Sequence, residues 1–292
     1  MLRSLVGSEM CIRDRADAVT DPWGLETRTP GSVLLVGCGK LGIRLGERLV
    51  AQGSEVTAMR RSAGDMPFPT IEADMRHPLD RELPEFDSVV ITLPPSTEGD
   101  SIYPPALRGL AKALPTMPER VVFVSSTRVF EGRPGETPLT ERDAPKVSSE
   151  RGGDLVEGEH LAMELFGARI VRPAGIYGPG RDFLIRRVRE GAAVDHTRRT
   201  NRIHETDLVR LLEAMLRADS APPLIHAVDR EPVLLGDVVA HIASRLGVEP
   251  PPHLDPEVGG GTVLEGRLLQ EFLGDLEYPT FRAGYDEMIA AL

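Results

Sequence analysis

The sequence predicts an α/β fold in which helices cover both faces of a doubly wound parallel sheet, with a small α/β lobe at the C-terminal end. From Gly31 onward, apolar runs alternate with segments of helical period. The runs are apolar almost throughout, as expected of strands that are buried on both faces. The first run leads directly into a Gly-x-Gly-x-x-Gly turn that opens a helical segment. Right-handed crossovers then give one parallel sheet.

Six apolar runs are predicted to be strands, at 33–37, 55–60, 88–93, 121–125, 168–172 and 224–228. A further strand and turn are expected at 71–75. Helical patterns lie at 41–51, 103–114, 153–166, 182–190, 205–218, 235–246 and 285–291. This order predicts a dinucleotide-binding region over 31–172 and a substrate-side lobe over 173–292. The lobe is expected to return a last strand to the sheet near 224–228.

Residues 1–30 do not fit this pattern, because they show no sustained period and the first strand begins only at Val33. The stretch 4–15 resembles translated adapter or upstream sequence. We therefore interpret 1–30 as a non-native or disordered extension and leave it out of the predicted fold. A native regulatory arm is the alternative.

Composition excludes several classes of protein. With 292 residues and 41% hydrophobic content, the chain can bury one large core, or one core and a small lobe. The net charge of −11 argues against nucleic acids and anionic membranes as partners. No apolar run is long enough to span a bilayer, so a soluble cytoplasmic protein is expected. The sequence leaves monomer and homodimer open. Two cysteines, Cys11 and Cys38, exclude a disulfide framework and a cysteine-based metal site, and no metal is expected.

The glycine turn predicts a dinucleotide site. Gly37 permits the sharp turn, Gly39 lets the backbone approach a pyrophosphate, and Gly42 brings the helix close to the strand. The free N–H groups and the positive dipole end of the helix then face the phosphates. Lys40 and Leu41 complete the predicted pyrophosphate cradle, which acts largely through its backbone.

The second strand indicates which dinucleotide binds. An acidic residue at its C-terminal tip would accept a hydrogen bond from a ribose 2′-hydroxyl, but this strand ends in Arg60 and Arg61. A guanidinium suits a 2′-phosphate, so NADP is favoured, with NAD as the alternative. Asp74 is placed to contact the adenine amino group, or it is an ordinary capping aspartate.

Three segments resemble, in order, those of the NAD-dependent epimerase/dehydratase family, the extended short-chain dehydrogenases/reductases. Residues 122–132, Val-Phe-Val-Ser-Ser-Thr-Arg-Val-Phe-Glu-Gly, resemble the family segment Ser-Ser-Thr-x-Val-Tyr-Gly. Residues 171–180 match Arg-Pro-x-x-Ile-Tyr-Gly-Pro-Gly, and 201–208 resemble the Arg-Ile-His-x-x-Asp-Leu segment. The ending 277–284 is similar to that of an atypical subgroup. The ordered set is far more specific than any one motif.

The resemblance implies a Rossmann fold and a set of site residues. It adds Leu93, Ser125, Arg172 and Pro173 to the predicted cofactor contacts. It also implies a catalytic Ser or Thr, a Tyr that exchanges a proton with the substrate oxygen, and a Lys that lowers the pKa of the Tyr. Ser126 holds the family's serine position, and Thr127 can share its task.

The catalytic Tyr and Lys are absent. Their positions hold Arg151 and Leu155, and no tyrosine occurs between Tyr103 and Tyr177. An arginine stays protonated and cannot relay a proton as a phenol does, although Arg151 can polarise a carbonyl or hold an anion. The remaining candidates for the proton donor are Tyr177, which lies in a segment that lines the family's cleft, and Tyr103, His196 and His204.

Three functions are compatible with the absence of the catalytic Tyr and Lys. The first is an oxidoreductase or epimerase-like enzyme with a non-standard active site, acting on a small carbonyl or nucleotide-sugar-like substrate. The second is a catalytically silent, NADP-binding regulator or redox sensor. The third, an inert scaffold, is disfavoured because the phosphate turn survives. We favour the enzyme. Arginines outnumber acids over 181–202, so an anionic small-molecule substrate is expected, with a solvated helix face as the alternative.

Overall fold

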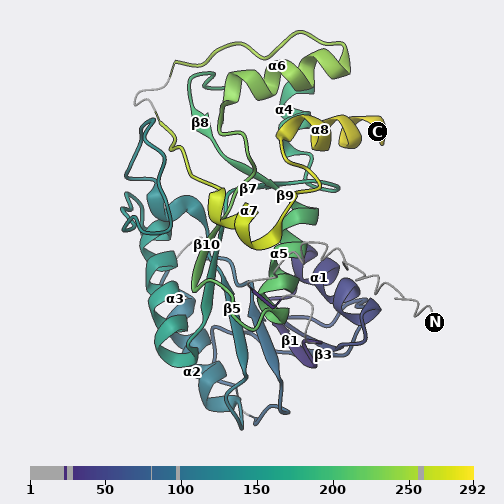
Figure 1. The fold of residues 1–292 in the computed structure, drawn as a ribbon, viewed down its shortest axis with the longest axis vertical. Helices are drawn as coiled ribbons and strands as arrows, with labels where there is room; N and C mark the ends of the chain where they lie inside the picture. Colours follow the sequence, from purple (N-terminus) through teal and green to yellow (C-terminus); the bar gives the residue numbers. More distant parts are fainter. Residues whose placement is uncertain (1–22, 25–28, 80, 97–98, 256–259) are drawn as a thin grey trace, which may run out of the picture.

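The computed structural model describes residues 23–24, 29–79, 81–96, 99–255 and 260–292. Its centre is a seven-stranded, all-parallel sheet, in the order β3–β2–β1–β4–β5–β6–β10, with helices on both faces (Figure 1). The predicted doubly wound Rossmann fold is thereby confirmed. The strands are β1 (Ser32–Val36), β2 (Glu55–Arg60), β3 (Thr70–Glu72), β4 (Ser88–Ile91), β5 (Arg120–Val124), β6 (Arg169–Pro173) and β10 (Leu224–Ala227).

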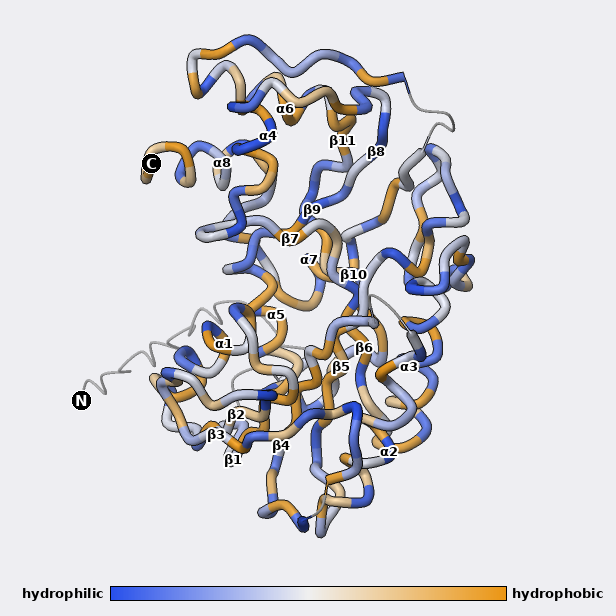
Figure 2. Tube along the Cα trace, turned by 180° about the vertical axis from the view of Figure 1, so that it is seen from behind, coloured by the Kyte–Doolittle hydropathy of each residue, from blue (hydrophilic) through white to orange (hydrophobic). Residues whose placement is uncertain are grey.

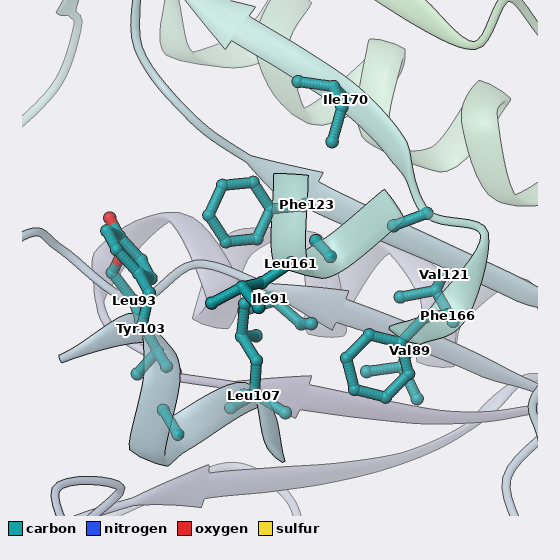
Figure 3. Packing of buried hydrophobic residues seen from close by; sticks show 14 of the residues in the cluster. Val89, Ile91, Leu93, Tyr103, Leu107, Val121, Phe123, Leu161, Phe166 and Ile170 are labelled. Atoms are coloured by element: carbon teal, nitrogen blue, oxygen red, sulfur yellow. The ribbon is translucent and has the colours of Figure 1, made fainter. Parts of the chain in front are cut away.

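Each face of the sheet has its own apolar core. One core lies under α2 (Tyr103–Ala113) and α3 (Glu150–Phe166), where Tyr103, Leu107 and Phe123 pack against β4 and β5 (Figure 3). The other lies under α1 (Lys40–Ala51), α5 (Glu205–Arg217) and α7 (Arg267–Leu273). The strands between these cores are apolar on both faces, which the hydropathy of the trace shows along the central strands (Figure 2).

A smaller lobe stands beyond the carboxyl ends of the strands (Figure 1). Its own core is formed by residues of three helices and of the segments between them, including Tyr177, Val188, Ile242, Phe281 and Tyr285. A parallel pair of strands, β7 with β9, and an antiparallel pair, β8 with β11, connect the helices. The elements are β7 (Gly175–Tyr177), α4 (Phe183–Arg189), β8 (Arg199–Thr200), β9 (Arg202–His204), β11 (Val233–Leu234), α6 (Leu235–Leu246) and α8 (Phe281–Ala290).

Two helices begin several residues before their predicted starts. The pattern predicts one of them from residue 153. The helix α3 begins earlier, at Glu150, because the Ser149 hydroxyl caps it by accepting a hydrogen bond from Gly152 N. The helix α7 was not predicted from the sequence, and α8 begins four residues before its predicted start.

Trp23, which lies in the segment interpreted as an extension, packs on the fold, and the domain boundary at residue 30 stays a prediction. Trp23 packs edge-to-face on Phe272 of α7, with ring centroids 5.5 Å apart, and its indole N–H donates to the carbonyl of Glu271 at 3.1 Å. Ser220 N in turn donates to the carbonyl of Trp23. The stretch 4–15, which resembles translated upstream sequence, lies outside the described residues.

Candidate functional site

The glycine turn lies where the sheet order reverses, between β1 and β4, the usual ligand site of a doubly wound sheet. Gly37 has a φ of +79°, and a Cβ there would lie 2.9 Å from Leu93 Cδ2 and 3.1 Å from Leu93 N. The turn is anchored by Gly37 N and Cys38 N, which both donate to the carbonyl of Met59. Only glycine therefore fits this bend against Leu93.

The amino end of α1 suits an anion. Its N-cap residue, Gly39, supplies no side-chain acceptor, and no acidic residue occupies the first helical turn. A Cβ on Gly39 would meet only one atom within 4 Å, at 3.9 Å, so the space beside the turn is open. Uncapped N–H groups and the helix dipole thus face a space that a pyrophosphate can enter, and the residues present fit the predicted dinucleotide.

The residues predicted to read the adenosine end lie near the turn but have protein partners. Arg60 Nη1 lies 3.0 Å from Met66 Sδ. Burial raises the pKa of the Cys38 thiol to about 11, and the charge of Arg60 opposes this rise. Arg61 is exposed. Asp74 binds Arg76 through both carboxylate oxygens, and the hydrogen bond from Arg76 lowers the pKa of Asp74 to about 2.

Ser126 and Thr127 follow β5 directly and open a short 3₁₀ helix, η1 (Thr127–Phe130). The Ser126 hydroxyl caps this turn by accepting a hydrogen bond from Arg128 N at 3.2 Å. Thr127 Oγ1 donates to the carbonyl of Pro173 at 3.4 Å, which links the ends of β5 and β6. The two predicted catalytic hydroxyls are thus held at the carboxyl edge of the sheet.

Ser125 and Arg172, which were predicted to contact the cofactor, have side chains that bind Glu159 instead. The Ser125 hydroxyl donates to Glu159 Oε1 at 2.6 Å. Arg172 forms a two-point pair with the same carboxylate, with Nε 2.8 Å from Oε1 and Nη2 2.6 Å from Oε2. All three residues are buried, so any cofactor contact at Ser125 and Arg172 would come from the backbone. Sequence reasoning used Glu159 only as a landmark and missed this role.

Neither replacement in the family's Tyr-x-x-x-Lys pair restores its chemistry. Arg151 lies exposed in the first turn of α3, and Leu155 is buried in the core under that helix. Near this turn, the Glu131 carboxylate accepts hydrogen bonds from Ser149 Oγ, from Ser148 N at 3.3 Å and from Arg128 Nη1 at 3.0 Å. Burial would raise the pKa of Glu131, but these hydrogen bonds and the charge of Arg128 outweigh it and lower the pKa.

The structure argues against the tyrosines as proton donors. The Tyr177 phenol points into the lobe, where it donates to the carbonyl of Thr280 at 3.3 Å and its ring stacks on Tyr285. Tyr103 lies in the core and donates to the carbonyl of Leu93 at 3.1 Å. Burial raises the pKa of both phenols. Tyr177 lines the cleft, as its segment predicts, although its phenol packs against α8; its catalytic role stays a prediction.

The two candidate histidines have structural partners as well. His204 is buried and caps α5, its Nδ1 accepting from Thr206 N at 3.2 Å, and burial lowers its pKa to about 4. His196 places its Nε2 2.9 Å from the carbonyl of Pro251. Both side chains thus order loops and helix ends of the lobe.

A cleft of about 970 Å³ separates the edge of the sheet from the lobe. Ser126, Thr127 and Glu131 line one wall. Among the described residues, its lining contains two carboxylates, Glu131 and Asp195, against six arginines: Arg128, Arg181, Arg187, Arg198, Arg199 and Arg202. Five of these arginines, all but Arg128, belong to the cationic stretch 181–202 that was singled out in the sequence together with Arg186 and Arg189. The cleft is therefore positive although the whole chain is acidic.

Most of the cleft arginines are fixed by the protein. Arg181 Nε lies 3.1 Å from Glu205 Oε2, and Arg199 pairs with Glu136. Arg187 Nη2 donates to the carbonyl of Ala193 at 2.7 Å. Within the described part of the chain, no carboxylate forms an ion pair with Arg187 or Arg198. These two charges are available to an anionic ligand.

A set of contacts joins the predicted cofactor helix to the cleft. Lys40 Nζ donates to the carbonyl of Gly180 at 2.8 Å, and Arg44 Nη2 donates to that of Pro179 at 3.0 Å. Glu205, which is buried, forms ion pairs with both arginines, because Arg44 Nε lies 3.3 Å from Oε1 and Arg181 Nε lies 3.1 Å from Oε2. The loop after β7 is therefore held directly over the start of α1.

Two general findings bear on function. No group of three or more His, Cys, Asp or Glu side chains in the described ranges could hold a metal ion. None of the helices in those ranges is both long and apolar enough to cross a membrane.

Comparisons with known proteins give structural relatives only. No family model matches the chain, and no curated protein matches it. A solved structure from Methylobacillus flagellatus, assigned to the NAD-dependent epimerases/dehydratases, is 30% identical. The match covers 89% of this chain and 98% of that one, with a TM-score of 0.75.

Two further solved structures share the fold at lower identity. MoeE5 in complex with UDP-glucuronic acid and NAD is 23% identical, with a TM-score of 0.72 and coverage of 89% of this chain and 98% of that one. A UDP-glucuronic acid 4-epimerase from Bacillus cereus in complex with NAD is 17% identical, with a TM-score of 0.72 and coverage of 89% and 99%.

Proposed function

This chain belongs to the NAD-dependent epimerase/dehydratase family, the extended short-chain dehydrogenases/reductases, and from that premise we propose that it is an oxidoreductase or epimerase-like enzyme. It would bind NADP in preference to NAD and act on an anionic, nucleotide-sugar-like or small carbonyl substrate. The observation that carries this proposal is the positive cleft, which runs from Ser126 at the edge of the sheet to the arginines of the lobe.

The glycine turn is where the dinucleotide would bind. Gly37, Gly39, Lys40, Leu41 and Gly42 would hold the pyrophosphate through backbone N–H groups and the amino end of α1. Lys40 adds an ammonium group whose partner here, the carbonyl of Gly180, is uncharged. Arg60 and Arg61 would bind the 2′-phosphate. The nicotinamide ring would supply the hydride acceptor or donor.

The substrate side follows from the cleft. Relatives of the same fold were solved with UDP-glucuronic acid or UDP-glucose together with NAD. In this chain, Arg187 and Arg198 have charges that can bind the phosphates of such a ligand. Ser126 would hydrogen-bond the reacting oxygen, with Thr127 beside it. Arg151 can polarise that oxygen but, because it stays protonated, would not carry a proton to or from it.

A titration with dinucleotides tests the cofactor. We expect calorimetry to show NADPH and NADP⁺ binding at least about tenfold more tightly than NADH and NAD⁺, because a guanidinium pairs with the 2′-phosphate. The substitution Arg60→Asp should bring the ratio of the NADP(H) and NAD(H) affinities to about one. The matched control is Arg108→Asp, at an exposed arginine of α2 outside the cleft, which should leave it unchanged. Binding of none of the four dinucleotides would overturn the proposal.

The sensor function remains a second candidate because Leu155 holds the position of the family's lysine, and the buried phenols of Tyr103 and Tyr177 donate to backbone carbonyls. A sensor would bind NADPH and NADP⁺ with different affinities and show no hydride transfer. Measuring nicotinamide absorbance with a panel of nucleotide sugars and small carbonyls separates the two functions. Turnover of any substrate rules out the sensor.

A further inference from the structure

Arg128 lies at the reacting end of the cleft, away from the arginines of the lobe. It is the second residue of η1, and its backbone N–H donates to the hydroxyl of Ser126 at 3.2 Å. Its side chain lines the cleft together with Ser126 and Thr127, and 47% of that side chain is exposed. A ligand group bound by this guanidinium would therefore lie within one side chain's length of the oxygen at Ser126.

The guanidinium of Arg128 is held in place by Glu131. Arg128 Nη1 donates to Glu131 Oε2 at 3.0 Å. The other oxygen of that carboxylate is occupied by the Ser149 hydroxyl and by Ser148 N, and 19% of the Glu131 side chain is exposed. Because these contacts fix the Glu131 carboxylate to the start of α3, the carboxylate holds the Arg128 guanidinium in one orientation.

This arrangement leaves donors free. A guanidinium has five N–H donors in a planar fork, and Arg128 uses one nitrogen, Nη1, for Glu131. Among the described residues, no acceptor binds its Nε or Nη2. Two parallel donors that face a cleft match a carboxylate better than any uncharged sugar hydroxyl. The charge of the cleft also favours a carboxylate, because arginines outnumber carboxylates among the described residues that line it.

We propose that Arg128 binds a carboxylate that the substrate carries next to the carbon that gives or takes the hydride. The cleft would then select acidic sugars over neutral ones. The lobe arginines would hold phosphates at one end, and Arg128 would hold the carboxylate at the other. This inference rests on the proposed function, because it requires the reacting oxygen of the substrate to lie at Ser126.

The test uses two ligands that differ only in the group concerned, UDP-glucuronic acid and UDP-glucose. Each is titrated calorimetrically into the full chain saturated with NADP⁺. The acid should bind at least about tenfold more tightly than the neutral sugar. In Arg128→Gln this ratio should fall to about one, while the affinity for UDP-glucose stays the same. Arg128→Lys should retain part of the ratio, since it keeps the charge but loses the fork.

Arg108→Gln is the matched control and should leave the ratio unchanged, because Arg108 is exposed on α2 outside the cleft. Since the ratio compares two ligands on one variant, partial unfolding cancels. Equal affinities in the unsubstituted chain, or a ratio that survives Arg128→Gln, would overturn the role of Arg128 and leave the proposed function standing. If NADP⁺ binds but neither sugar nucleotide does, the nucleotide-sugar function fails, and the role of Arg128 fails with it.

Discussion

At the scale of single residues, Glu159 organises the end of the sheet. It accepts hydrogen bonds from Ser125, 34 residues earlier in the chain, and from Arg172, 13 residues later. It thereby ties α3 to the ends of β5 and β6, where Ser126 and Pro173 begin the cleft walls. An ion pair of this kind is costly to bury and holds only if its geometry is complete, as the two-point contact with Arg172 is.

We expect Glu159→Gln to lower the free energy of unfolding by about 3–5 kcal/mol, because the buried guanidinium of Arg172 loses its counter-charge. Urea denaturation at neutral pH measures the effect. The matched control is Glu157→Gln, an exposed position on the same helix, which should change the free energy by no more than about 0.5 kcal/mol. A loss below about 1 kcal/mol for Glu159→Gln would mean that the pair does not hold these elements together.

Residue-scale prediction from the sequence succeeded where the signal is local. The positive φ of Gly37 and the absence of a side-chain cap at Gly39 follow from six consecutive residues. It could not give the direction of the Tyr177 phenol, because that direction depends on α8, which comes much later in the chain. A Cβ on Gly284 of α8 would lie 2.8 Å from the Tyr177 hydroxyl, so this glycine makes room for the ring.

At the scale of elements, the strap 260–265 closes one side of the cleft without regular secondary structure. Leu139 forms two backbone hydrogen bonds with it: Leu139 N donates to the carbonyl of Val263, and the carbonyl of Leu139 accepts from Glu265 N. The Asn201 amide donates to the carbonyl of Thr262 and accepts from Leu264 N. These bonds join loop 132–146 to Asn201, which lies between strands β8 and β9 of the lobe. Sequence periodicity contains no signal for such a strap, because its partners are far apart in the chain.

Gly261 is the residue on which this strap depends. Its φ is +90°, and a Cβ there would lie 1.9 Å from the carbonyl oxygen of Arg199. We expect Gly261→Ala to lower the free energy of unfolding by about 2–3 kcal/mol, through both backbone strain and the clash. Gly247→Ala is the control, since Gly247 has a φ of +69° with no neighbour within 4 Å and should cost only about 1 kcal/mol. If chemical denaturation gives the same loss of unfolding free energy for Gly261→Ala and Gly247→Ala, the close approach of Gly261 to Arg199 does not contribute to the effect.

At the scale of the whole molecule, the cofactor half and the substrate half are joined through charged side chains. Arg44 on α1 and Arg181 beside the cleft share the carboxylate of Glu205, and Lys40 bonds the loop between them. The order of strands and helices was predictable because each element has its own period. The lobe's packing onto the sheet was not, since it depends on buried polar residues such as Glu205 and Asp207, which composition would place at the surface.

The N-terminal boundary of the cooperative fold can be measured with Trp23, which is the one tryptophan of the chain. Because its ring packs on Phe272 and its N–H bonds Glu271, its fluorescence reports on α7 and the core beneath it. We expect fluorescence and far-UV circular dichroism to give the same urea midpoint, as one cooperative unit requires. Trp23→Phe, followed by dichroism alone, should lower the free energy of unfolding by about 1–2 kcal/mol, since the indole hydrogen bond is lost. The urea midpoint should fall accordingly. A fluorescence midpoint well below that of dichroism would place Trp23 outside the cooperative fold and support the boundary at residue 30.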